Sequence, residues 1–320
     1  MKKIGVVTSG GDAPGMNAAI RAVVRLAYAR GLQVIGFRHG WGGLISNDFL
    51  SLTPRSVSGI VQAGGTMLHT CRCPEIMMEE GLRKAAGHIA ENKLDGLVVI
   101  GGDGSFRAAS ALSRYTGARM IGVPATIDND VFGTDETIGF DTAVNTAVSD
   151  IDKIRDTATS LDRIFIVEVM GRKRGFIACM VGLSSGAEII LVPEVPFDHE
   201  ALYRSIRENV AAGKKSGIIV AAEGIGDTGR LARDIEANTG VETRLSIIGY
   251  AQRGGNPSAR SRYLAALFGE KAVELLARDD SNAVVGLRDG HIIRISLEEA
   301  CRADKPLDLE ALRLAGQLAR

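Results

Sequence analysis

Two acidic turns in this sequence each lie just after a short apolar run. Gly101-Gly102-Asp103-Gly104-Ser105 follows residues 96–100, and Thr126-Ile127-Asp128-Asn129-Asp130 comes shortly after residues 120–123. Glycines let a phosphate approach the backbone, and a helix N-terminus favours negative charge. A carboxylate fits such a site when a divalent cation stands between it and the phosphate, so Asp103 indicates a Mg²⁺-nucleotide site. A plain strand-to-helix turn capped by Ser105 is the alternative.

The second turn carries two acids, Asp128 and Asp130, two residues apart. An aspartate with an ordinary pKa is ionised at neutral pH and can accept a proton. One acid could take a hydroxyl proton while the other supports a metal or an orientation. An Asx-turn is the structural alternative, because Asp and Asn are common in such turns. That alternative does not explain why both acidic turns follow what look like neighbouring buried strands.

Several basic residues stand where they could meet anions. Arg21 and Arg25 are four apart on one face of an expected helix, where they form either an anion site or two solvated charges. Arg72 lies in a loop that Pro74 helps to keep extended, and it could reach a phosphate across a cleft. Arg172 follows the end of an apolar run. The Gly-rich turn at 9–17 lacks the spacing of a P-loop or a dinucleotide fold.

Composition bounds the class of protein. The 320 residues are 45% hydrophobic and 24% charged, with 38 basic and 38 acidic side chains, which is typical of a globular protein without a nucleic-acid or membrane surface. The start shows no signal peptide, and no apolar run is long enough to span a bilayer. The four cysteines show neither zinc spacing nor a disulfide framework. A reducing cytoplasm is the expected location.

Apolar runs alternate with amphipathic segments along the chain, which predicts an α/β fold of two lobes, each a mainly parallel sheet flanked by helices. The chain crosses between lobes near 138–140. Residues 39–44 read as a loop, in which Trp41 either caps a nucleotide or covers the core. The expected strands are 3–8, 33–37, 96–100, 120–123, 163–169, 189–192, 217–222, 242–248 and 283–287. The expected helices are 18–30, 79–92, 106–115, 142–159, 198–211, 260–277 and 307–319.

Five motifs, in order over essentially the whole chain, resemble those of the bacterial ATP-dependent 6-phosphofructokinases. They are Ser9 to Asn17, Gly101 to Ser105, Thr126 to Asp130, Met170-Gly171-Arg172 and Gln252-Arg253-Gly254-Gly255. The GGDG turn alone also occurs in NAD and lipid kinases. The Thr126 to Asp130 motif and the Gln252 to Gly255 motif argue against those kinases.

The resemblance implies a fold, a reaction and an assembly. It implies a phosphofructokinase-like chain with a nucleotide-binding lobe (1–138 plus 251–305) and a sugar-phosphate-binding lobe (139–250 plus 306–320). The implied reaction moves the γ-phosphoryl of ATP, with Mg²⁺, to the 1-hydroxyl of fructose 6-phosphate, a step of glycolysis that gives fructose 1,6-bisphosphate and ADP. The family is usually a homotetramer, in which active sites are shared between subunits.

The resemblance also implies residue roles. Asp128 resembles the general base, Asp103 the metal partner, and Thr126, Asp130 and Arg172 the remaining catalytic set. The implied ATP-binding residues are Gly11, Arg72, Cys73, Gly102, Asp103, Gly104 and Ser105. The implied substrate contacts are Thr126, Ile127, Asp128, Arg163, Met170, Gly171, Arg172, Glu223, Arg244, Tyr250 and Arg253, with Arg163 and Arg244 reaching a neighbouring subunit. The implied site for a nucleotide or phosphoenolpyruvate effector is Arg21, Arg25, Arg155, Gly186, Glu188, Lys214 and Lys215.

Some positions depart from the family pattern. Pro54 and Gly59 replace an Arg and an Asp, which puts regulation by ADP in doubt, and Tyr250 replaces a frequent His. Small residues at Gly104 and Ala125 leave room for an α-phosphate and favour ATP over pyrophosphate. A pyrophosphate-dependent enzyme, a kinase of another sugar phosphate and a catalytically silent sugar-phosphate-binding regulator remain alternatives.

Overall fold

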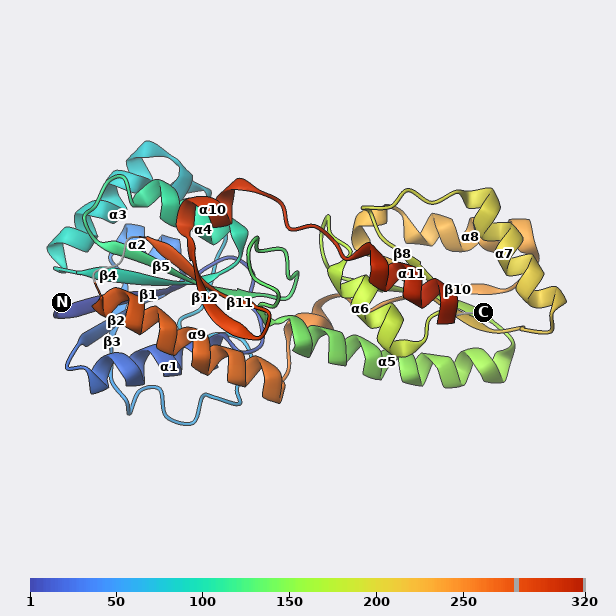
Figure 1. The fold of residues 1–320 in the computed structure, drawn as a ribbon, viewed down its shortest axis with the longest axis horizontal. Coiled ribbons are helices and arrows are strands. Elements are labelled where there is room, and N and C mark those ends of the chain that lie inside the picture. The colour runs from blue at the N-terminus through green and yellow to red at the C-terminus, as the bar shows by residue number, and fades with distance from the viewer. Residues whose placement is uncertain (279–281, 319–320) are drawn as a thin grey trace. The chain divides into compact units, whose positions relative to one another are not determined.

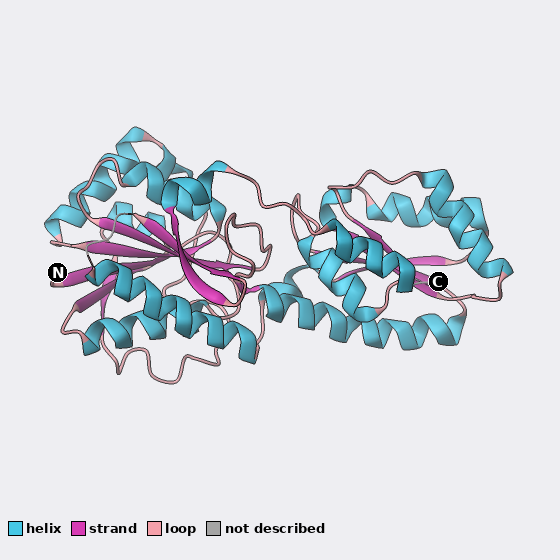
Figure 2. Ribbon diagram, viewed as in Figure 1, coloured by secondary structure: helices cyan, strands magenta, loops and turns pink. Residues whose placement is uncertain are grey.

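The computed structural model describes residues 1–278 and 282–318. The chain forms two compact units, one of Met1–Thr142 and Arg253–Lys305, the other of Ala143–Gln252 and Pro306–Arg320. Residues 139–142 thus belong to the first unit and 251–252 to the second, a small displacement from the expected lobe boundaries. Within the described residues no helix combines the length and apolar character that a membrane crossing needs. Figure 2 shows that strands flanked by helices build each unit.

The first unit is built on an eight-stranded sheet. Its order is β12-β11-β5-β4-β1-β2-β3, with β6 paired to β5. The pairings are parallel except at the two edges, where β3 and β12 run antiparallel to their neighbours. The strands are β1 (Lys3–Thr8), β2 (Gln33–Phe37), β3 (Phe49–Leu52), β4 (Gly96–Gly101), β5 (Arg119–Thr126), β6 (Ile138–Gly139), β11 (Ala283–Arg288) and β12 (His291–Ser296). The mainly parallel prediction is confirmed, and the two antiparallel edge strands are additions to it.

Helices cover both faces of this sheet. Helices α1 and α9 pack together on one face, and α3, α4 and α10 lie on the other (Figure 1). The helices are α1 (Met16–Ala29), α2 (Trp41–Ser46), η1 (Pro74–Met77), α3 (Glu79–Glu91), α4 (Asp103–Leu112), α9 (Ala259–Ala277) and α10 (Leu297–Arg302). The loop predicted at 39–44 was wrong, because the short helix α2 begins at Trp41. Trp41 is 2% exposed and packs in the core with Phe37 and Phe106.

The second unit has a four-stranded, fully parallel sheet in the order β10-β7-β9-β8. Helices α7 and α8 bury Leu202, Ile206 and Ile235 against it, and α6 packs on β8 and β9. The strands are β7 (Ile164–Val169), β8 (Ile189–Leu191), β9 (Gly217–Ala222) and β10 (Thr243–Ile247). The helices are α5 (Phe140–Leu161), α6 (Phe176–Ser185), α7 (His199–Ala211), η2 (Glu223–Ile225), α8 (Thr228–Thr239), η3 (Gly249–Arg253) and α11 (Leu309–Leu318). The last residue of the predicted helix 307–319 lies outside the described residues.

Candidate active site

Three loops meet at one edge of the first sheet. They follow β1, β4 and β5, which are parallel neighbours, so their carboxyl ends share an edge. The Ser9 amide donates to the Ile100 carbonyl at 3.0 Å, which ties the first loop to the end of β4. A Cβ on Gly101 would lie 2.6 Å from the Ser9 carbonyl oxygen and 2.5 Å from Ser105 Oγ. A side chain at Gly101 would therefore not fit between the loops that follow β1 and β4. This edge of the sheet is where ligands of open α/β sheets bind.

The turn after β4 forms the start of α4. The helix begins at Asp103, three residues earlier than predicted, and the Gly102 carbonyl accepts from the amides of Ser105 at 3.0 Å and Phe106 at 3.2 Å. The first N–H groups of a helix lack helical acceptors and carry the positive end of its dipole. A Cβ on Gly104 would meet no atom within 4 Å. The turn thus offers backbone donors and open space beside them.

Asp103 has a cationic neighbour, Arg107, that was not predicted from the sequence. Arg107 Nε lies 2.8 Å from Asp103 Oδ2, and the Asp103 side chain is 31% exposed. Burial, and then the charge of Asp103, raise the pKa of the nearby Cys301 thiol to about 11. Within the described ranges no group of three or more His, Cys, Asp or Glu residues is arranged to hold a metal. A single carboxylate fits a magnesium ion that also takes phosphate oxygens from its substrate.

The loop after β5 buries its first acid. Asp128 is 3% exposed and Asn129 is 5% exposed, with a positive φ of 53° at Asn129. The Asp128 amide donates to Thr126 Oγ1 at 3.2 Å, and the Thr126 carbonyl accepts from Thr137 Oγ1 at 2.6 Å. A Cβ on Gly102 would lie 3.3 Å from Thr126 Cβ. Thr126 therefore borders the turn of α4, and Asp128 is held two residues beyond it.

Other predicted ATP-site residues lie on this unit too. Gly11 faces Arg253, since a Cβ there would come within 2.2 Å of Arg253 Nη1, which also donates to the Asp12 carbonyl at 3.2 Å. Arg253, predicted as a sugar-phosphate contact, thus lies against the first Gly-rich turn. Arg72 is exposed, and Cys73 precedes η1, where burial raises the pKa of its thiol.

In the second unit, two side chains fix the loop after β7. The Met170 amide donates to Gln252 Oε1 at 2.8 Å, and the Arg172 amide donates to Glu223 Oε1 at 2.6 Å. Arg172 has a positive φ of 54°. Gln252 is fully buried and Glu223 directly follows β9. Four predicted substrate residues, Met170, Gly171, Arg172 and Glu223, therefore meet at the carboxyl edge of this sheet, whereas Tyr250 is 83% exposed.

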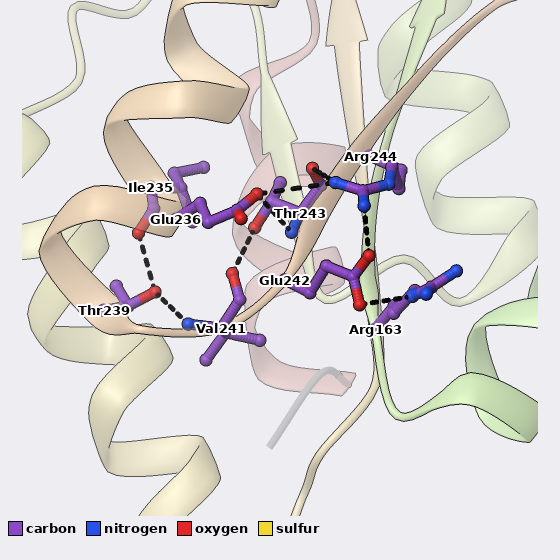
Figure 3. Close-up of polar contacts among 8 residues, drawn as sticks. All are labelled: Arg163, Ile235, Glu236, Thr239, Val241, Glu242, Thr243 and Arg244. Carbon is purple, nitrogen blue, oxygen red and sulfur yellow. Dashed lines mark hydrogen bonds and ion pairs between the residues drawn. The ribbon is translucent and has the colours of Figure 1, made fainter.

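Arg163 and Arg244 share one carboxylate (Figure 3). Arg163 Nε donates to Glu242 Oε2 at 2.6 Å, and the Arg244 guanidinium pairs with the other oxygen of Glu242. Arg244 Nη1 also lies 3.5 Å from Glu236 Oε2. The parallel pairing of β7 with β10 brings the two arginines together. Both arginines were predicted from the sequence as substrate contacts, whereas the Glu242 carboxylate that holds them was not.

The predicted effector residues fall on both units. In the second unit Arg155 and Lys214 both face Glu188 Oε1, at 3.6 Å and 3.2 Å, and Arg155 donates to the Gly186 carbonyl at 3.0 Å. Lys215 instead lies 3.7 Å from Asp162 Oδ2.

Arg21 and Arg25 lie on α1 of the first unit. Arg25 Nη2 is 3.5 Å from the Pro54 carbonyl, one of the positions that depart from the family pattern.

Comparison with known proteins identifies the family. The family model described as Phosphofructokinase matches residues 3–276. The ATP-dependent 6-phosphofructokinase of Halothermothrix orenii is 48% identical over 331 residues, and the ATP-dependent 6-phosphofructokinase 1 of Thermus thermophilus is 50% identical over 321 residues; both alignments cover 100% of each chain.

Solved structures agree with this match. The Pichia pastoris phosphofructokinase structure has a TM-score of 0.88 at 31% identity, and the match covers 99% of this chain and 36% of that chain. A pyrophosphate-dependent phosphofructokinase from Marinobacter aquaeolei shares the fold at 22% identity, with a TM-score of 0.86 and coverage of 98% and 91%. The chain belongs to the phosphofructokinase family.

Proposed function

We propose that this chain is an ATP-dependent 6-phosphofructokinase of glycolysis, which transfers the γ-phosphoryl of ATP to the 1-hydroxyl of fructose 6-phosphate. The observation that carries the proposal is full-length identity of 48–50% to bacterial relatives of that name. Three loops with glycines and acids at one sheet edge give it chemical support.

The nucleotide lies, in this proposal, along the carboxyl edge of the first sheet. Gly11, Arg72 and Cys73, with Gly102 to Ser105, form its cradle, and the N-terminus of α4 faces its phosphates. Asp103 holds Mg²⁺, which when bound with the nucleotide neutralises charge on the phosphates. Arg107 orients the Asp103 carboxylate from one helical turn away. The open space beside Gly104 supports ATP rather than pyrophosphate as donor.

Asp128 takes the proton from the attacking sugar hydroxyl. A general base must be fixed within hydrogen-bond reach of its proton, and burial at 3% exposure in a tied loop gives Asp128 that rigidity. Thr126 and Arg172 donate hydrogen bonds to the phosphoryl group as it is transferred. Asp130 supports the loop that carries Asp128. Phosphoryl transfer depends chiefly on such positioning and electrostatics.

Fructose 6-phosphate is held by the remaining predicted contacts. Ile127, Met170, Gly171, Glu223, Tyr250 and Arg253 contact the sugar phosphate. In a homotetramer, Arg163 and Arg244 bind the 6-phosphate of the fructose 6-phosphate that occupies a neighbouring subunit's active site. Two guanidinium groups match the charge and shape of a phosphate dianion. Glu242 keeps the two groups paired until the phosphate arrives.

Replacing Arg244 by serine should raise the KM for fructose 6-phosphate roughly 10- to 100-fold with a smaller change in kcat, because a charge-assisted contact to substrate is lost. Steady-state kinetics on the variant measure this. Arg230→Ser is the control, as Arg230 is an exposed arginine of the same unit that pairs with Asp234 at 3.5 Å. An unchanged KM in the Arg244 variant would remove this residue from the site.

We also propose regulation and a location. Arg21, Arg25, Arg155, Gly186, Glu188, Lys214 and Lys215 bind a phosphorylated effector, a nucleotide or phosphoenolpyruvate, in the tetramer. Pro54 and Gly59 alter the response to ADP. Four free thiols agree with a cytoplasmic enzyme.

Turnover of fructose 6-phosphate with Mg²⁺ and either ATP or pyrophosphate tests the proposal. Activity with ATP alone is the expected result. Activity with pyrophosphate would mean that Gly104 and Ala125 do not select the donor. Activity with neither would favour another sugar phosphate or a silent binding protein.

A further inference from the structure

Lys305 contacts the loop that carries Asp128, and no motif singles it out. It is the last residue of the first unit, just beyond α10. Its Nζ donates to the Asp135 carbonyl oxygen at 2.9 Å. The same oxygen accepts from Asn129 Nδ2 at 3.1 Å. One carbonyl thus joins Lys305 to the residue between Asp128 and Asp130.

These two hydrogen bonds to the Asp135 carbonyl hold Lys305 and Asn129 to the same point of the backbone. Asn129 is buried in the left-handed conformation, which Asn adopts more readily than other non-glycine residues, and its side-chain amide is fixed by the Asp135 carbonyl. Asp135 is itself anchored, because its amide donates to the Leu287 carbonyl at 2.7 Å and its Oδ2 accepts from the Asp289 amide at 2.8 Å. Lys305 is therefore linked to the Asp128–Asp130 loop through the carbonyl of a residue that is itself hydrogen-bonded to β11 and to Asp289.

Lys305 is also a positive charge among three carboxylates. Asp130, Asp135 and Glu136 all stabilise its ammonium, and Glu136 is shared with Arg260 of α9, 2.8 Å away. Burial outweighs these carboxylates and lowers the pKa of Lys305 to about 8. The ammonium is thus charged below about pH 8 and neutral above it.

We propose that Lys305 is a positioning residue for phosphoryl transfer, one that holds the Asp128–Asp130 loop in its working geometry and balances the acids around it. The proposal rests on the proposed function of Asp128. The competing interpretation is a purely structural lysine that only anchors the chain where it leaves the first unit.

The test compares Lys305→Met with Lys305→Arg. The methionine variant should lose roughly 10- to 100-fold in kcat, the size of loss that a misplacement of about 1 Å can cause, while KM for both substrates stays within about threefold. The arginine variant, which keeps a charged donor, should recover most of kcat. Lys271→Met is the matched control, since Lys271 is a partly buried lysine of the same unit paired with Glu274 at 3.2 Å; it should leave kcat unchanged.

The pH profile separates positioning from anchoring. Wild-type kcat should fall as pH rises through about 8, where Lys305 loses its proton, and the fall should vanish in Lys305→Arg, because arginine stays charged. A melting curve on each variant reports folding independently of turnover. Full kcat in a folded Lys305→Met variant, or no rescue by arginine, would overturn the proposal. An inactive wild-type enzyme would instead overturn the proposed function.

Discussion

Replacing Asp128 by serine should lower kcat by about 10²- to 10⁴-fold, the usual contribution of a general base, while KM for fructose 6-phosphate changes little. The proton of the 1-hydroxyl must leave as the phosphoryl group arrives, and serine cannot accept it at neutral pH. Substrate affinity is expected to survive because the proposed phosphate contacts, such as Arg163 and Arg244, lie on the second unit. Steady-state kinetics on the purified variant measure both constants.

Asp128→Asn serves as the partner experiment. Asparagine keeps the size of the side chain in a site that is 3% exposed, so it removes the base without opening a cavity. Equal losses in the two variants would attribute the effect to the missing base. Full turnover in either folded variant would contradict the assignment of Asp128.

Replacing Gly101 by alanine should destabilise the first unit by about 1–3 kcal/mol and weaken ATP binding. The new Cβ would fall 2.6 Å from the Ser9 carbonyl oxygen, a backbone atom that cannot rotate away. Relief requires that the loops after β1 and β4 separate, which opens the cradle in which we place the nucleotide. Urea unfolding gives the stability change, and equilibrium titration with ATP gives the affinity.

Gly104→Ala is the matched control for unfolding. It lies three residues away, its Cβ would meet no atom within 4 Å, and it sits in the first turn of α4, where alanine is a better helix former. Its unfolding midpoint should stay the same or rise slightly. If both variants unfold alike, crowding at Gly101 is not the cause.

The central strands could be predicted from the sequence because they are buried on both faces. Continuous apolar runs gave β1, β2 and β9 with their observed ends. Where burial is one-sided or glycine intervenes, the signal weakens. The helix at Trp41 contains Gly42 and Gly43, poor helix formers, and exists because Trp41, Leu44 and Ile45 are buried. Edge strand β12 leaves most of its side chains partly exposed and gives no apolar run.

Some residues of the candidate site could likewise be predicted from the sequence, and others could not. The acidic turns were found because they follow buried strands, and the pairing of β4 with β5 confirms that those strands are neighbours. The ion pair between Arg107 and Asp103 could have been predicted, because the two residues are four apart on one helix. That prediction requires α4 to begin at Asp103 rather than at residue 106. The contact of Lys305 could not be predicted, because its partner Asp135 is 170 residues earlier in the chain. Contacts of that range leave no periodic pattern.

The interrupted first unit also constrains how this protein is made. Strand β11, which pairs with β5, begins at Ala283, after the whole four-stranded sheet of the second unit. A ribosome adds about 5–20 residues per second, so β5 remains an open edge for on the order of ten seconds while residues 143–252 emerge. An apolar strand edge is a template for another chain. The nascent protein therefore exposes an apolar strand edge in mid-synthesis, and β11 covers that edge only after the second unit has been made.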